Sequence, residues 1–192
     1  HRRIDPGIGK KALRDLRPTA AGGRVFDLDA GGLDPVPDRV GATPVLVGSC
    51  LGPVLEQCGD EYVDGAAQLL SDLDDAGFLL AVATGKTRAG LDRAIAKNGL
   101  AGRFHATRCA DEGLPKPHPD MLLALMDRLA ADPRDTLMIG DTTHDLDLAR
   151  NAGAHGLAVA YGAHPPEGLA ARGPLATVHS IAELRSWLAA NA

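Results

Sequence analysis

The hydrophobic positions of this chain follow two patterns that alternate along most of its length. Short uninterrupted apolar runs, such as 78–83, are typical of strands that are buried on both faces. Between them, apolar residues recur every three or four positions, which predicts helices with one buried face. The runs predict strands at 78–83, 104–107, 137–139, 156–160 and 176–178, and the periodic segments predict helices at 61–76, 87–98, 117–131, 146–153 and 181–190.

The alternation of strand and helix predicts the fold class. It favours an α/β fold with a three-layer, Rossmann-like parallel sheet that carries helices on both faces. Right-handed crossovers would bring the carboxyl ends of all strands to one edge of that sheet. Residues that follow different strands are therefore expected to meet there.

The first sixty residues show a less regular pattern. We interpret 1–23 as an irregular N-terminal segment and Arg24 to Asp29 as a short β-type run that ends in two aspartates. Residues 34–60 are rich in proline and glycine, which predicts a small insert with little core of its own. The predicted core therefore comprises 24–33 and 61–192.

The composition of the chain mainly excludes classes of function. The chain of 192 residues is 45% hydrophobic and 23% charged, as is usual for a globular protein. Its net charge of -5 gives no electrostatic footprint for nucleic acid, and no apolar run is long enough for a membrane span. The three cysteines lack Cys-x-x-Cys spacing, which disfavours a disulfide framework or zinc site and fits a reducing, cytoplasmic location.

The richest chemistry follows the apolar run Leu137 to Ile139. Gly140 ends this run, and two carboxylates, Asp141 and Asp145, come next, just before a helical pattern. Open α/β sheets bind ligands at such strand ends, and paired carboxylates suit a hard cation such as Mg²⁺. The alternative is that both aspartates merely cap the following helix.

Several other polar residues are expected at the same edge. Asp27 and Asp29 end the first run, Thr84 ends another, and Lys116 precedes a predicted helix. A carboxylate nucleophile, a hydroxyl, an ammonium and a metal-binding acid pair are what phosphoryl transfer through an aspartyl-phosphate needs. The metal and the lysine would offset the repulsion between the nucleophile and an anionic phosphate.

In this order the motifs resemble the haloacid dehalogenase (HAD) superfamily, and most closely its phosphoglycolate-phosphatase-like branch. Phe26 to Asp29 is similar to the family's first motif, although Ala30-Gly31-Gly32 stands where the family has Gly-Thr-Leu. The matching segments for the second, third and fourth motifs are Ala81 to Lys86, Gly113 to Pro119, and Ile139 to Asp145. The resemblance implies that residues 34–60 are a small or reduced cap insert.

The resemblance also implies roles for the aspartates. Asp27 would attack phosphorus, and Asp29 would protonate the leaving oxygen and then activate water. Asp141 would bind Mg²⁺ together with Asp27 and Asp29, and Asp145 would support the metal directly or through Lys116 or water.

For the phosphoryl group, the resemblance implies three residues. Thr84 and Gly85 would hold its oxygens, and Lys116 would neutralise the charge that gathers around it. The implied substrate is a small phosphorylated metabolite, with no nucleic-acid or membrane partner. The cap, which sets selectivity in this family, is too unusual here to name that substrate, and the sequence leaves the oligomeric state open.

Two alternatives remain open at this point. The motifs can also be aligned with the family in a second register, in which Gly32 to Asp38 resembles a segment of the cap. Arg24 to Asp29 would then be the end of a cap helix, and the strand that carries the nucleophile would be missing from this chain. The chain would then be a binding or regulatory protein on the same fold. A dehalogenase is disfavoured, because such enzymes lack the metal and would leave Asp29 without a role.

Overall fold

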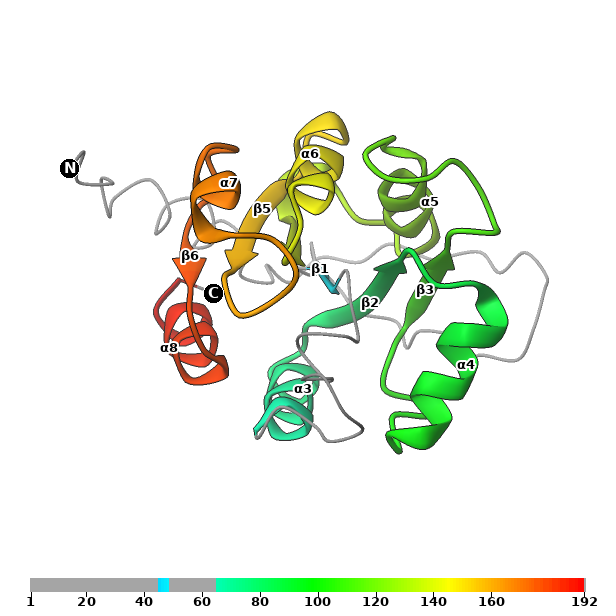
Figure 1. Cartoon of the computed structure of the whole chain (residues 1–192). Coiled ribbons are helices and arrows are strands. Elements are labelled where there is room, and N and C mark those ends of the chain that lie inside the picture. Colours follow the sequence, from blue (N-terminus) through cyan, green and yellow to red (C-terminus); the bar gives the residue numbers. More distant parts are fainter. Residues whose placement is uncertain (1–44, 49–64, 192) are drawn as a thin grey trace.

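The computed structural model describes residues 45–48 and 65–191, which form a six-stranded sheet with the order β3-β2-β1-β4-β5-β6. Every strand pairing is parallel, so all carboxyl ends lie along one edge, as predicted (Figure 1). The strands are β1 (Val45–Gly48), β2 (Leu79–Thr84), β3 (Ala106–Cys109), β4 (Thr136–Gly140), β5 (His155–Val159) and β6 (Thr177–Val178).

The central strand, β1, is the main departure from the sequence-based expectation. The patterns assign 45–48 to the insert 34–60, whereas these four residues pair with both β2 and β4. The apolar run is short and lies between Pro44 and Gly48, so its sequence pattern is that of a loop. It forms a strand because it is buried and pairs with a strand on each side. The prediction that 34–60 form an insert is therefore wrong for 45–48. The other residues of 34–60 lie outside the described part of the chain.

Helices cover both faces of the sheet, which confirms the predicted α/β architecture. α3 (Ala66–Asp75), α4 (Arg88–Lys97) and α8 (Ile181–Asn191) pack on one face, and α5 (Asp120–Arg128) and α6 (Thr143–Asn151) on the other (Figure 1). A short helix, α7 (Pro166–Ala170), packs through Leu169 against Leu146 of α6 and Ala158 of β5.

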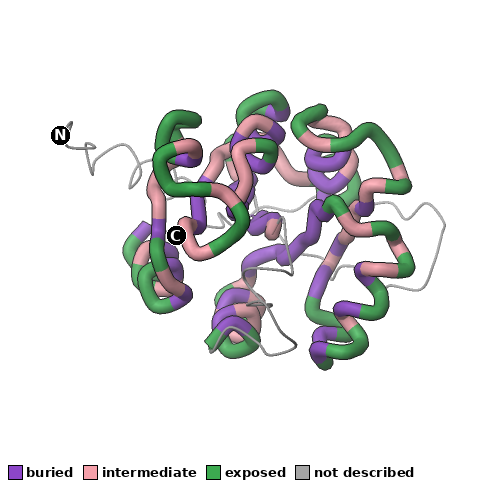
Figure 2. Tube along the Cα trace, in the orientation of Figure 1, coloured by how far each residue is buried: buried purple, intermediate pink, exposed green. Residues whose placement is uncertain are grey.

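The core lies directly against the sheet, on both of its faces. All residues of β2 and β4 are buried, whereas each helix alternates buried and exposed positions (Figure 2). Side chains alternate between the two faces along a strand, so Leu46 joins one apolar cluster and Val45 and Val47 join the other. The strand ends next to the site are thus held by packing on both sides.

The predicted elements within the described residues are present, with shifted ends. α5 begins at Asp120 rather than at residue 117, and β3 begins at Ala106 rather than at residue 104. The short helix α7 lacks a long apolar repeat, and the sequence patterns do not predict it. None of the helices in residues 65–191 is long and apolar enough to cross a membrane.

Candidate active site

Strand order places the candidate site at the carboxyl edge, around β1, β2 and β4. Strands β2 and β3 lie on one side of β1, and strands β4, β5 and β6 lie on its other side. The strand order therefore reverses direction between β1 and β4. Ligands of open α/β sheets bind in the crevice at such a switch point. Thr84 ends β2 and Asp141 directly follows β4 at this edge.

Thr84 is a buried hydroxyl at the end of its strand, with only 1% of its surface exposed. Its Oγ1 accepts a hydrogen bond from the backbone N–H of Lys86, at 3.1 Å. Thr87, not Thr84, caps α4, because the Thr87 side chain accepts from Gly90 N–H. The bond to Lys86 uses a lone pair of Thr84 and leaves the hydroxyl hydrogen to donate to a ligand.

Lys116 reaches this edge from the loop that precedes α5. Its Nζ donates to the carbonyl of Ala83 at 2.8 Å and to Asp145 Oδ1 at 2.7 Å. The lysine side chain is 11% exposed and the aspartate side chain 2%. An ammonium carries three hydrogens, so these two bonds fix the group and leave one hydrogen for an anion.

Asp145 sits in the first turn of α6. Its Oδ2 accepts from the N–H and the hydroxyl of Thr142, and the Thr142 hydroxyl accepts from Asp145 N–H, which forms a capping box. The capping alternative from the sequence therefore holds for Asp145, which also pairs with Lys116. Gly140 makes the close approach possible, because a Cβ there would lie 2.2 Å from Asp145 Cβ.

Asp141 is a second buried carboxylate, 2% exposed, in the loop between β4 and α6. The segment after β5 lies against it: Ala163 N–H donates to Asp141 Oδ2 at 2.8 Å, and His164 N–H donates to the Asp141 carbonyl at 3.2 Å. A Cβ at Gly162 would lie 2.2 Å from Asp141 Cβ. The segment 162–164 thus sets the orientation of the carboxylate.

Tyr161 directly precedes the segment 162–164, and no sequence motif identifies it as a site residue. Its hydroxyl is buried and has no hydrogen-bond partner in the described part of the chain. Burial, with a further contribution from the charge of Asp141, raises the pKa of Tyr161 to about 12. The one signal in the sequence is its place just after a predicted buried strand, and an isolated tyrosine there gives no recognisable motif.

The structure therefore brings together the end of β2, which carries Thr84, with Lys116 and Asp145, and Asp141 lies in the loop that leads into the helix of Asp145. Gly85 links Thr84 to Lys86 in the turn before α4. Asp27 and Asp29 lie outside the described residues. Within residues 45–48 and 65–191, no three His, Cys, Asp or Glu side chains are grouped as a complete metal-binding set.

Comparisons with known proteins agree with this architecture. Residues 56–159 match the family model described as haloacid dehalogenase-like hydrolase. The chain is 39% identical over 132 residues to a Dickeya dadantii protein named "Probable phosphatase IndB". The aligned region covers 68% of this chain and 57% of that protein. It is 33% identical over 119 residues to a phosphoglycolate phosphatase of Vibrio vulnificus, with coverage of 61% and 52%.

A similar fold is present in solved structures. A Clostridium acetobutylicum protein described as "a predicted phosphatase" superposes with a TM-score of 0.61 at 31% identity, over 66% of this chain and 59% of that one. The chain thus spans a little over half the length of each of these relatives. The matched residues include the segments that carry Thr84, Lys116, Asp141 and Asp145.

Proposed function

The chain belongs to the haloacid dehalogenase-like hydrolase family, and from this premise we propose that it hydrolyses a small phosphate monoester with the help of Mg²⁺, through an aspartyl-phosphate intermediate. One observation carries the proposal. The Lys116 ammonium is fixed between Asp145 and the carbonyl of Ala83, and the residue that follows Ala83 is the buried Thr84.

These groups suit a phosphoryl group. The remaining hydrogen of Lys116 and the hydroxyl hydrogen of Thr84 would supply two donors for its oxygens, and the backbone N–H of Gly85 would supply a third. Donors that are fixed before the reaction stabilise developing charge without reorganising, and removal of one such donor typically lowers the rate by about 10²–10³.

The donor chemistry also fits Mg²⁺. Asp141 is a buried carboxylate oriented by Ala163 N–H, and Mg²⁺ is commonly held by one or two carboxylates together with waters and substrate oxygens. We propose Asp141 as its ligand, joined by Asp27 and Asp29. The bound ion would supply positive charge against the phosphoryl oxygens.

Asp145 has a different role in this proposal. Its Oδ1 already accepts from Lys116 and its Oδ2 from Thr142. The sequence leaves open whether Asp145 supports the metal directly or through Lys116 or water. These contacts favour support through Lys116. Asp145 would orient Lys116, which then neutralises charge at the phosphoryl group.

The nucleophile is the part of the proposal that depends on residues outside the described ones. Asp27 would form the phosphoenzyme, and Asp29 would protonate the leaving oxygen and later activate water. Residues 34–60, apart from β1, would form the reduced cap. Location in the cytoplasm stays a prediction.

One observation favours a second candidate function. The strand between β2 and β4 is Val45–Gly48, and the sequence continues with Ser49 and Cys50 rather than with an aspartate. If no carboxylate reaches the site, the chain is a phosphate-binding or regulatory protein on the same fold.

A p-nitrophenyl phosphate assay with and without Mg²⁺ separates these candidates. We expect Mg²⁺-dependent turnover that is abolished in Asp27→Asn and in Asp141→Asn, with unchanged circular dichroism. Asp147→Asn is the matched control, because this residue lies on α6 and pairs with Arg150 rather than with site residues. Phosphate binding without turnover would favour the second candidate, and full activity of Asp141→Asn would refute the metal assignment.

The substrate can be sought among the compounds named for the relatives. Phosphoglycolate is the first to test, since the Vibrio vulnificus relative is named for it. A Pseudomonas aeruginosa relative, 34% identical over 105 residues, is named an N-acetylmuramic acid 6-phosphate phosphatase. The ratio of kcat/KM for these two esters would show which class of substrate the site prefers.

A further inference from the structure

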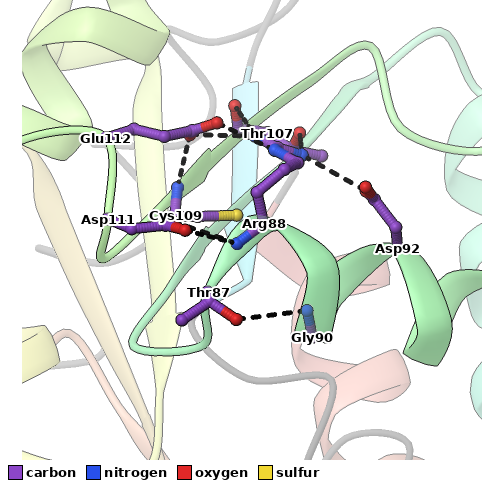
Figure 3. Close-up of polar contacts among 8 residues, drawn as sticks. All are labelled: Thr87, Arg88, Gly90, Asp92, Thr107, Cys109, Asp111 and Glu112. Carbon is purple, nitrogen blue, oxygen red and sulfur yellow. Dashed lines mark hydrogen bonds and ion pairs between the residues drawn. The ribbon is translucent and has the colours of Figure 1, made fainter.

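Arg88, the first residue of α4, contacts the chain around β3 through both its side chain and its backbone (Figure 3). Its Nε donates to Glu112 Oε1 at 2.8 Å and its Nη2 to Glu112 Oε2 at 2.9 Å, a two-pronged ion pair. Its Nη1 also donates to Thr107 Oγ1 at 2.7 Å. The guanidinium is therefore held by both a carboxylate and a strand residue.

Backbone contacts reinforce the same connection. Arg88 N–H donates to both oxygens of Asp111, at 2.9 and 3.1 Å, and Ala110 N–H donates to the Lys86 carbonyl at 3.0 Å. Cys109 N–H donates to Glu112 Oε2 at 2.8 Å. The side chain of Glu112 thus folds back on its own loop while it holds Arg88.

The two segments joined in this way are the ones that carry site residues. Arg88 lies four residues after Thr84, and Glu112 lies four residues before Lys116. The same two segments are also joined by the pairing of β2 with β3, in which Thr84 lies opposite Cys109, and by the bond from Lys116 Nζ to the Ala83 carbonyl. A shift of either segment would therefore change the distance between the Thr84 hydroxyl and the Lys116 ammonium.

Both members of the ion pair are held in their charged forms. The hydrogen bonds from Arg88 lower the pKa of Glu112 below its usual range, and those to Glu112 raise the pKa of Arg88. Their side chains are 28% and 35% exposed, and a single pair at that exposure adds little to stability. The number of contacts therefore points to a role in geometry rather than in overall stability.

We propose that the Arg88–Glu112 pair is a positioning device, which holds the Thr84 turn against the Lys116 loop so that hydroxyl and ammonium reach one phosphoryl group. This inference rests on the proposed function, since it assumes that the two groups share a ligand. Neither Arg88 nor Glu112 touches that ligand.

The decisive variant is Glu112→Gln, which keeps the shape of the side chain and removes its charge. We expect kcat/KM for p-nitrophenyl phosphate to fall by about 10-fold to 100-fold, because small misplacements of reacting groups have effects of this size. Inhibition by inorganic phosphate should weaken in parallel. Arg88→Lys keeps the charge without the planar fork and should give a smaller loss.

A readout within the loop separates positioning from general destabilisation. Cys109 is fully buried, and burial raises the pKa of its thiol to about 11, so it should react slowly with iodoacetamide at neutral pH. In Glu112→Gln, labelling of Cys109 should accelerate while the melting temperature changes little. Asp132→Asn is the control, because its partner Arg134 lies before β4, away from the carboxyl edge.

The outcomes distinguish this inference from the proposed function. An active wild-type chain with unchanged kcat/KM and phosphate inhibition in Glu112→Gln would overturn the positioning role and leave the phosphatase proposal intact. If the wild-type chain shows no turnover, calorimetric binding of inorganic phosphate replaces the assay, and Glu112→Gln must weaken it. Failure of the wild-type chain to bind phosphate would overturn both.

Discussion

Lys116 Nζ lies 2.7 Å from Asp145 Oδ1, although the lysine comes from the loop before α5 and the aspartate from the first turn of α6. The same ammonium donates to the Ala83 carbonyl. A single buried cation thus connects the end of β2, the loop before α5 and the first turn of α6. Its contacts fix a positive charge at the carboxyl edge, against the carbonyl of the residue that precedes Thr84.

The first prediction concerns this pair. Lys116→Met should lower kcat by about 10²–10³, because it removes a fixed cation from the phosphoryl group. It should also lower the free energy of unfolding by about 3–5 kcal/mol, because Asp145 is left buried and uncompensated. Urea denaturation and the phosphatase assay measure the two effects.

The double variant Lys116→Met/Asp145→Asn provides the control. It removes the buried charge and should regain part of the lost stability without regaining activity. Equal stability of the single and double variants would mean that the pair is not a buried ionic contact of the kind described.

The second prediction concerns the close approach of Gly140 to Asp145. Gly140→Ala would place a methyl group 2.2 Å from Asp145 Cβ, a distance that requires the α6 N-terminus to move. We expect destabilisation of about 1–3 kcal/mol, typical of overpacking, and loss of turnover as Asp145 leaves Lys116. In Gly168→Ala, the nearest atom to the new methyl is 3.8 Å away, so this variant should remain stable and active.

Much of the sheet could be predicted because its strands are continuous apolar runs. Leu79 to Ala83 and Leu137 to Ile139 need no tertiary information to be recognised as buried strands. Val45–Gly48 is different, because only its pairing with β2 and β4 distinguishes it from an apolar stretch in a proline-rich loop. The assignment of the central strand therefore required the three-dimensional structure.

For the site, the order of the motifs predicted that Thr84, Lys116 and the Asp141–Asp145 loop meet at one edge. The sequence could not reveal the residues that orient them. Gly162 and Ala163 orient Asp141 through the position of their backbone, and Arg88 acts through an ion pair with the distant residue Glu112. None of these residues belongs to a local motif. The same limit applies to the division of roles between the two aspartates, which depends on which hydrogen bonds each one accepts.

The third prediction concerns the orientation of Asp141. A Cβ at Gly162 would collide with the Asp141 side chain, at 2.2 Å from its Cβ and 2.5 Å from its Oδ2. Gly162→Ala should therefore weaken Mg²⁺ binding, measured by calorimetry in the absence of substrate, by at least about 10-fold, the lower end of the usual cost of disturbing a ligand's supporting contacts. Gly173→Ala is unsuitable as a control because its φ is +65°, so Gly168→Ala serves again. Unchanged Mg²⁺ affinity would argue against Asp141 as a ligand.

The last prediction uses the buried hydroxyl of Tyr161. Its pKa is raised from the usual value of 10 to about 12, so the folded chain holds this proton more tightly than the unfolded chain. The resulting stability is fully present below pH 10 and is lost as the pH rises towards 12, at about 1.4 kcal/mol for each pKa unit of difference. Tyr161→Phe should remove this component of the alkaline decline.

At neutral pH the same variant should be at least as stable as the wild-type chain, because it removes a buried hydroxyl with no described partner. Urea denaturation of both chains at pH 7, 10 and 11 measures the difference and cancels the titration of groups that they share. A constant difference across these pH values would show that Tyr161 ionises equally readily in the folded and unfolded states. A difference that grows in favour of Tyr161→Phe above pH 10 would confirm that burial beside Asp141 keeps the hydroxyl protonated.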